Sequence, residues 1–267
     1  KENYEGNVFS PMGCRSFLSP WKDEKGNYKF DGRFNMGVVS LNLPQIGILA
    51  RGSEERFFEI LDKRLELAEK ALLLRYNLLK DVVSDVSPIH WQHGAIARLK
   101  KGEKIARFLT GGYATISLGY IGIYEATRLI TGESNTGEKG RVFAMKIMDR
   151  LNDAINLWHD KHNLGFGLYG TPAESLTNRF SSLDRARFGV IEDITDKGYY
   201  TNSYHVNVRE EINVFDKFNF ESEFQKKSTG GCISYAEIPN MTNNIPAVLT
   251  MIQYIYDHIS YAEFNTK

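Results

Sequence analysis

Apolar residues recur at two different spacings along this chain, and the two spacings predict alternating helices and strands. Between Ser53 and Lys80 an apolar residue returns every three or four positions, which predicts a long helix with one buried face. Ser53 can cap its first turn, where Glu54 and Glu55 suit the helix dipole. Further helices are predicted over residues 124–130, 143–158, 171–189 and 244–258.

Short runs rich in β-forming residues lie between these helical segments. The predicted strands cover residues 36–43, 113–119, 164–169, 198–208 and 232–238, and a last extended run covers 259–264. Residues 215–227 are amphipathic and leave helix and strand open. Strands that alternate with helices predict βαβ units and a mostly parallel sheet, which makes this an α/β protein.

Composition and charge narrow the function classes. The chain has 267 residues, of which 42% are hydrophobic and 25% charged, as in ordinary globular proteins. Its 33 basic and 33 acidic residues leave no net charge to attract a nucleic acid or an anionic membrane. No apolar run is long enough to span a bilayer, and the first residues lack a signal-peptide pattern.

Cysteine and histidine give few sites for redox or metal chemistry. The two cysteines, Cys14 and Cys232, lie far apart, which predicts a reduced, cytoplasmic setting and leaves a disulfide between them unsupported. The histidine pairs 90/93 and 159/162 are each three residues apart, so each could offer two metal ligands. Neither pair has an evident third ligand, and we predict no metal site.

Cys14 lies in a turn formed by Pro11 and Gly13, upstream of the predicted strand 36–43. A cysteine on a loop before a buried strand is well placed to project into a cavity. A free cysteine is nevertheless more often a small buried apolar residue than a reactive group. Spacing alone therefore favours a structural role for Cys14.

The segment GTPAE at 170–174 has the pattern of a helix start after a strand. Thr171 can act as the N-cap, Pro172 occupies the first helical position, and Glu174 completes a capping box. The free N–H groups of a helix N-terminus attract anions, so residues from Ala173 to Ser175 are candidates for binding phosphate. The charge of Glu174 counts against this assignment.

Several motifs together resemble the anaerobic (class III) ribonucleotide reductases. They run in that family's order over nearly the whole chain: MGCRSF (12–17), GRFNMG (32–37), NLP (42–44), GTPAE (170–174), RF (179–180), DRARFG (184–189), YYTNSYHV (199–206) and GGCISY (230–235). The resemblance implies the second half of a ten-stranded α/β barrel, of the type that ribonucleotide reductases and glycyl-radical enzymes share. A finger loop would occupy residues 1–35 and a half-barrel residues 36–267.

The same resemblance assigns roles to individual residues. Cys14 matches the finger cysteine that becomes a thiyl radical, and Ser16 and Asn35 match positions around the ribose hydroxyls. Thr171, Ala173, Glu174 and Ser175 would form the substrate-phosphate site, whereas Cys232 matches no catalytic cysteine and is expected to be structural. Without the resemblance, Ser16 reads as a capping hydroxyl and Asn35 as a turn residue.

Cofactors and partners follow from the family as expectations. A glycyl radical, made by an S-adenosylmethionine iron–sulfur activase, and a structural zinc would lie on segments absent here, and this chain itself would bind neither. The partners would be a ribonucleoside triphosphate, formate or a thiol reductant, the activase, the missing barrel half and a second subunit of a homodimer. On this reading the chain is a fragment that is inactive alone.

Two alternatives stay open on the sequence. One is another glycyl-radical enzyme of the formate-lyase type, which shares the barrel and the finger cysteine. The other is a non-catalytic assembly fragment that retains the fold for subunit contacts.

Overall fold

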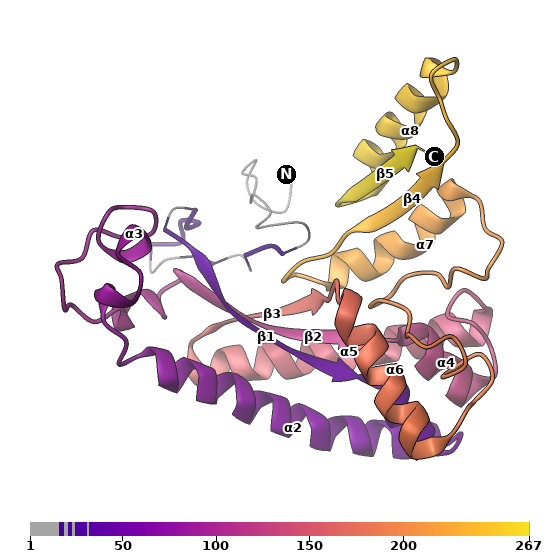
Figure 1. Cartoon of the computed structure of the whole chain (residues 1–267), viewed down its shortest axis with the longest axis horizontal. Helices are drawn as coiled ribbons and strands as arrows, with labels where there is room; N and C mark the ends of the chain where they lie inside the picture. The colour runs from indigo at the N-terminus through magenta and orange to yellow at the C-terminus, as the bar shows by residue number, and fades with distance from the viewer. Residues whose placement is uncertain (1–15, 19–20, 23–24, 31, 267) are drawn as a thin grey trace.

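Three parallel strands form the centre of the molecule (Figure 1). The computed structural model describes residues 16–18, 21–22, 25–30 and 32–266. Strand β1 (Phe34–Asn42) pairs with β2 (Ala114–Ile121), and β2 pairs with β3 (Gly165–Gly170). Successive strands lie side by side in the same direction, as expected for βαβ units.

A second parallel sheet continues this order. Strand β4 (Ser234–Ile238) pairs with β5 (Ala262–Thr266), and the residues just before β4 join it to β3. The N–H of Gly170 donates to the carbonyl of Gly231 at 2.9 Å, and the N–H of Gly230 donates to Leu168 at 2.7 Å. The five strands therefore follow one another in chain order, which confirms the predicted α/β fold and fits part of a barrel.

Two long helices cover one face of the β1–β2–β3 sheet (Figure 1). Helix α2 (Glu54–Leu79) follows β1, and α5 (Glu138–His162) follows β2. Their buried faces join the strands in the main apolar core, where the rings of Phe57 and Phe143 meet edge to face. Ser53 Oγ accepts the N–H of Arg56, which confirms the predicted cap of α2.

The remaining helices occupy the connections and the C-terminal part of the chain. They are α1 (Leu43–Ala50), α3 (Pro88–Trp91), α4 (Ile123–Thr131), α6 (Glu174–Phe188), α7 (Val214–Lys227) and α8 (Ile245–His258). Helix α7 resolves the ambiguity over residues 215–227. The predicted cap of α8 is also confirmed, because the side chain of Asn244 accepts the N–H of Ala247.

The sequence pattern does not predict helix α1. The predicted strand 36–43 ends one residue early in the structure, and the chain turns directly into a helix at Leu43. Asn42 caps that helix by accepting the N–H of Gln45, and Pro44 occupies its first turn. The helix is too short and too uniformly apolar to show a helical period.

The strand predicted over residues 198–208 is wrong. Gly198 has φ +77° and Ser203 has φ +39°, values that a strand does not accommodate. The carbonyls of Thr201 and Ser203 accept the N–H groups of Gly122 and Ile123 at the start of α4, at 3.0 and 3.1 Å. The backbone groups that a strand would use for pairing therefore hold this segment against α4 as an irregular loop.

Candidate active site

One face of the β1–β2–β3 sheet is polar where the other is apolar. Because side chains alternate along a strand, Ile116 and Leu118 join the core while Ser117 and Gly119 point to the opposite face. Hydroxyl groups reach this face from Ser40 of β1, Ser117 of β2 and Thr171 in the turn after β3, beside larger side chains such as Val38 and Tyr169. It is the face on which two of the predicted site residues, Asn35 and Thr171, make their contacts.

Both ends of the Asn35 side chain are engaged. Its Nδ2 donates to Ser117 Oγ at 2.9 Å, and its Oδ1 accepts the N–H of Gly37 at 2.6 Å. Asn35 lies on β1, and Ser117 lies on the neighbouring β2. The amide therefore has a defined orientation, and its contact with the N–H two residues ahead is the one that a turn residue makes.

Thr171 contacts β1 rather than capping a helix. The hydroxyl groups of Thr171 and Ser40 lie 3.0 Å apart, and Thr171 Oγ1 also donates to the carbonyl of Tyr169 at 3.3 Å. Helix α6 begins at Glu174, with Ala173 as an N-cap that offers no side-chain hydrogen bond. The predicted helix start at residue 171 and the Thr171–Glu174 capping box are therefore wrong, because the hydroxyl is used across the sheet.

The other predicted phosphate-binding residues lie at the start of α6. The N–H of Ala173 donates to the side-chain carbonyl of Asn202 at 3.1 Å, so the irregular loop supplies the partner that a cap would have supplied. Ser175 lies exposed in the first turn, and the side chain of Glu174 lies outside what the structure describes.

Ser16 is held against the strands by its own backbone. It forms an antiparallel bridge with Gly231, and the N–H of Phe17 donates to Gly230 at 3.0 Å. Gly231 in turn bridges Tyr169, which stands opposite Gly119 in the register. Ser16 therefore lies at the same level of the sheet as the contact between Ser40 and Thr171. Cys14 lies outside the described residues.

A buried carboxylate that the sequence reading did not single out closes one end of this face. Asp184 of α6 accepts hydrogen bonds from Asn42 at 2.7 Å, Gln45 at 2.6 Å and Tyr200 at 2.9 Å. Burial, and then the charge of Asp184, raise the pKa of the Tyr200 hydroxyl, which keeps it a donor. The contact ties α6 to the end of β1 and to the irregular loop.

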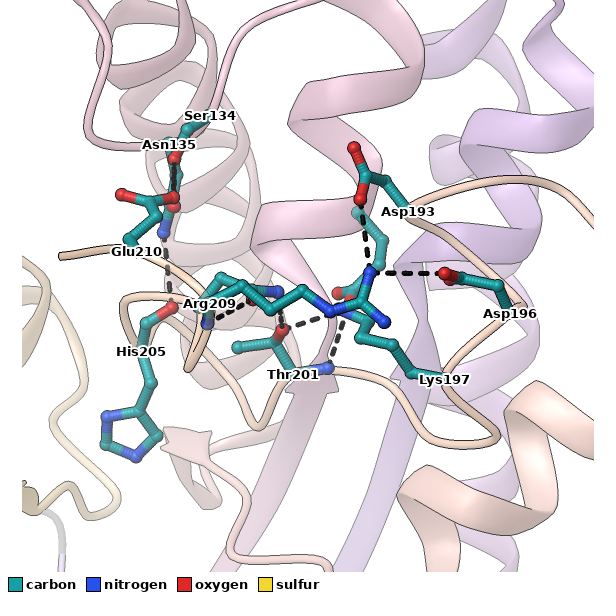
Figure 2. A network of polar contacts seen from close by, with 11 residues as sticks. Ser134, Asn135, Asp193, Asp196, Lys197, Thr201, His205, Arg209 and Glu210 are labelled. Atoms are coloured by element: carbon teal, nitrogen blue, oxygen red, sulfur yellow. Dashed lines mark hydrogen bonds and ion pairs between the residues drawn. The ribbon is translucent and has the colours of Figure 1, made fainter.

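A second polar network fixes the irregular loop to α4 (Figure 2). Glu125 is fully buried and forms an ion pair with Lys197 at 3.2 Å, and it accepts the N–H and the hydroxyl of Thr201, each at 2.8 Å. Figure 2 also shows Arg209 reaching Asp193 and Asp196. Burial raises the pKa of Glu125 although Lys197 and Thr201 oppose the shift.

Cys232 is a buried, free thiol directly after the glycines that pair with Ser16 and Phe17. Burial raises the pKa of the Cys232 thiol to about 12, so the group stays protonated at neutral pH. These properties support the structural role expected for it.

The histidines of the pair 159/162 have partners other than a metal. His159 Nδ1 contacts the carbonyl of Leu164 at 2.9 Å, and His162 Nε2 contacts Glu69 at 2.7 Å. Over the part of the chain that the structure describes, no three His, Cys, Asp or Glu side chains converge as a metal site would require. No helix in that part has both the length and the apolar character needed to cross a bilayer.

Comparison with known proteins identifies relatives over the whole length of the chain. The family model described as "Anaerobic ribonucleoside-triphosphate reductase" matches residues 1–267. Curated proteins of that name are similar to the chain: 44% identity over 264 residues in Salmonella typhimurium, 43% over 264 in Escherichia coli and 42% over 261 in bacteriophage T4. These alignments cover 98%, 98% and 96% of this chain, but only 37%, 37% and 42% of the relatives.

Solved structures of an anaerobic ribonucleotide reductase from Thermotoga maritima share the fold. The structure with citrate in the active site has a TM-score of 0.70 at 21% identity, over 93% of this chain and 43% of that one. The complex with dATP and CTP also has a TM-score of 0.70, at 22% identity, over 94% of this chain and 39% of that one.

Proposed function

Because the chain belongs to the anaerobic ribonucleoside-triphosphate reductase family, we propose that it forms part of the catalytic barrel of an enzyme that reduces ribonucleoside triphosphates to 2′-deoxyribonucleotides. The observation that carries the proposal is the family match over residues 1–267. Identities above 40% to curated reductases favour this function over an enzyme of the formate-lyase type or a non-catalytic assembly fragment.

The chain spans 37% of the length of its Salmonella and Escherichia relatives, so the proposed activity belongs to a larger assembly. We propose that the other barrel strands, a radical-generating activase, formate or a thiol reductant, and a second subunit complete that assembly. A glycyl radical in the complete enzyme would supply the unpaired electron.

Within this chain, Cys14 is the proposed hydrogen-atom carrier. As a thiyl radical, its sulfur takes the 3′ hydrogen of the ribose, which re-forms the S–H bond and leaves the radical on the sugar. The hydrogen returns to the 3′ carbon at the end of the cycle. Ser16 and Asn35 hydrogen-bond the ribose hydroxyls as neutral groups, so they orient the sugar without adding a charge beside the radical.

The start of α6 is the proposed position of the substrate phosphates. A helix N-terminus carries a partial positive charge, and its first N–H groups point outward to an anion. The N–H of Ala173 is occupied by Asn202, so phosphate binding at this group requires the Asn202 side chain to move away. Thr171 is set beside this turn by its contact with Ser40.

A chimaera tests the proposed function directly. The chain replaces the matching segment of a curated relative, and reduction of ribonucleoside triphosphates is measured without oxygen in the presence of that relative's activase and reductant. We expect activity from the chimaera, none from its Cys14→Ala variant, and activity from the matched Cys232→Ala variant. Activity that survives Cys14→Ala contradicts the catalytic role of Cys14.

A further inference from the structure

Strand β1 carries a bulge directly after Asn35. Asn35 stands opposite Thr115 and Val38 stands opposite Ser117, so β1 uses one more residue than β2 over this stretch. Gly37, within the bulge, has φ +127°, a conformation that favours glycine. Bulges of this kind bend a strand and redirect the neighbouring side chain.

The bulge creates the acceptor contact of Asn35. The N–H of Gly37 turns to Asn35 Oδ1 at 2.6 Å. The other end of the same amide donates to Ser117 Oγ at 2.9 Å. An amide side chain has a donor end and an acceptor end that a flip would exchange, so these two contacts select one orientation. One N–H hydrogen and one lone pair of the amide remain for a ligand.

The opposite side of the bulge is held by α2. Arg75 Nη1 donates to the carbonyl of Met36 at 3.4 Å. A Cβ atom placed on Gly37 would lie 2.1 Å from the same nitrogen, so the guanidinium occupies the space that a side chain would need. The bulge is therefore enclosed by the helix on one side and by the Asn35 amide on the other.

We propose that Ser117 is a positioning residue that, together with the bulge at Gly37, fixes the side-chain amide of Asn35 for a ribose hydroxyl. This inference rests on the proposed function, because it takes Asn35 to face the sugar. Ser117 itself has its hydroxyl engaged by Asn35 and acts through that residue. Without the hydrogen bond from Asn35 Nδ2 to Ser117 Oγ, the amide can rotate about its side-chain bonds. A smaller fraction of the enzyme then presents the amide to the ribose hydroxyl in the required orientation.

The chain offers a matched control two residues away on the same strand. Thr115 points to the same face as Ser117, and both residues are 1% exposed. Among the described residues, the Thr115 hydroxyl has no hydrogen-bond partner. Ser117→Ala and Thr115→Val each remove one buried hydroxyl oxygen, but only the first removes a contact with Asn35.

The test uses the active chimaera, with kcat, KM, thermal unfolding and a crystal structure measured for each variant. We expect Ser117→Ala to lower kcat about tenfold, the size of one neutral hydrogen bond, and to change KM by less than about twofold. The Asn35 amide should occupy a second orientation in its crystal structure. Thr115→Val should keep kcat within about twofold and leave the Asn35 amide in place.

Combining Ser117→Ala with Asn35→Ala tests whether Ser117 acts through Asn35. If Ser117 acts through Asn35, adding Ser117→Ala to Asn35→Ala lowers kcat no further. The inference is overturned if Ser117→Ala retains full kcat, if the two losses multiply, or if the amide keeps its orientation without Ser117. An inactive parent chimaera contradicts the proposed function, whereas the crystal structures still decide whether Ser117 orients Asn35.

Discussion

The hydroxyl oxygens of Ser40 on β1 and Thr171, the residue after β3, lie 3.0 Å apart although β2 runs between β1 and β3. The contact passes over Gly119, which stands opposite Ser40 in the register of β1 and β2. A Cβ atom on Gly119 would lie 2.1 Å from Thr171 Oγ1 and 2.3 Å from Ser40 Oγ. The hydrogen bond therefore exists only because the strand between the two residues has no side chain at this point.

Gly119→Ala is expected to separate these hydroxyls and to destabilise the fold by about 2 kcal/mol, because the new methyl group overpacks a strand interior. Ser40→Ala removes the same hydrogen bond without overpacking and should cost about 1 kcal/mol. Urea unfolding of both variants measures the difference. Equal losses in the two variants would contradict the steric argument.

Removing only one partner of the ion pair between Glu125 and Lys197 is expected to destabilise the protein strongly. Glu125 is fully buried and the Lys197 side chain is 4% exposed. Lys197→Met leaves a buried carboxylate without its cation, and we expect a loss of about 3 kcal/mol in the free energy of unfolding. The double variant Lys197→Met, Glu125→Gln should recover most of that loss. A double variant as unstable as Lys197→Met alone would show that the charge is not the cause.

The sequence predicted the elements that carry a clear period or a local cap. The long helix α2 and its cap at Ser53 follow from spacing and from one side chain, and both are confirmed. The parallel order of the strands follows from their alternation with helices. Each of these features depends on residues that are close together in the chain, so the local sequence is enough to predict it.

The features that the sequence could not predict depend on distant partners. Thr171 looks like a helix cap until Ser40, 131 residues away, takes its hydroxyl. Residues 198–208 look like a strand until Glu125 and the start of α4 take their backbone groups. The orientation of Asn35 depends on Ser117, 82 residues away. Such pairings depend on how distant segments pack against one another, which composition and period do not encode.

Cys232 is expected to resist alkylation in the folded chain. Burial raises the pKa of the Cys232 thiol to about 12, so little thiolate forms at pH 8. Cys232 is also only 1% exposed, so the reagent cannot easily reach its sulfur. Treatment with iodoacetamide at pH 8 followed by peptide mass spectrometry should leave Cys232 unmodified in the native chain. Full modification in denaturant is the control, and rapid native modification would contradict the burial.

The buried carboxylate of Glu221 predicts a pH-dependent part of the stability. Burial alone would raise its pKa, but His205 and Lys217 outweigh that effect and lower the pKa to about 2 from an ordinary value of 4.5. Glu221 Oε1 accepts from Lys217 Nζ at 2.6 Å, from the N–H of Val206 at 3.1 Å and from His205 Nδ1 at 3.2 Å. These contacts tie α7 to the irregular loop.

Because the folded-state pKa of Glu221 is depressed, its contribution is fully present above pH 4.5 and is lost as the pH falls through about 2. Glu221→Gln should therefore unfold more easily than the wild type at pH 6, and the gap between them should shrink by about 3 kcal/mol towards pH 2. The gap between the wild type and Lys217→Met, which removes one of the two groups that lower the pKa of Glu221, should shrink by less over the same range. Urea unfolding at several pH values measures all three chains. A gap that stays constant between pH 6 and pH 2 would show that the pKa of Glu221 is not lowered in the folded protein.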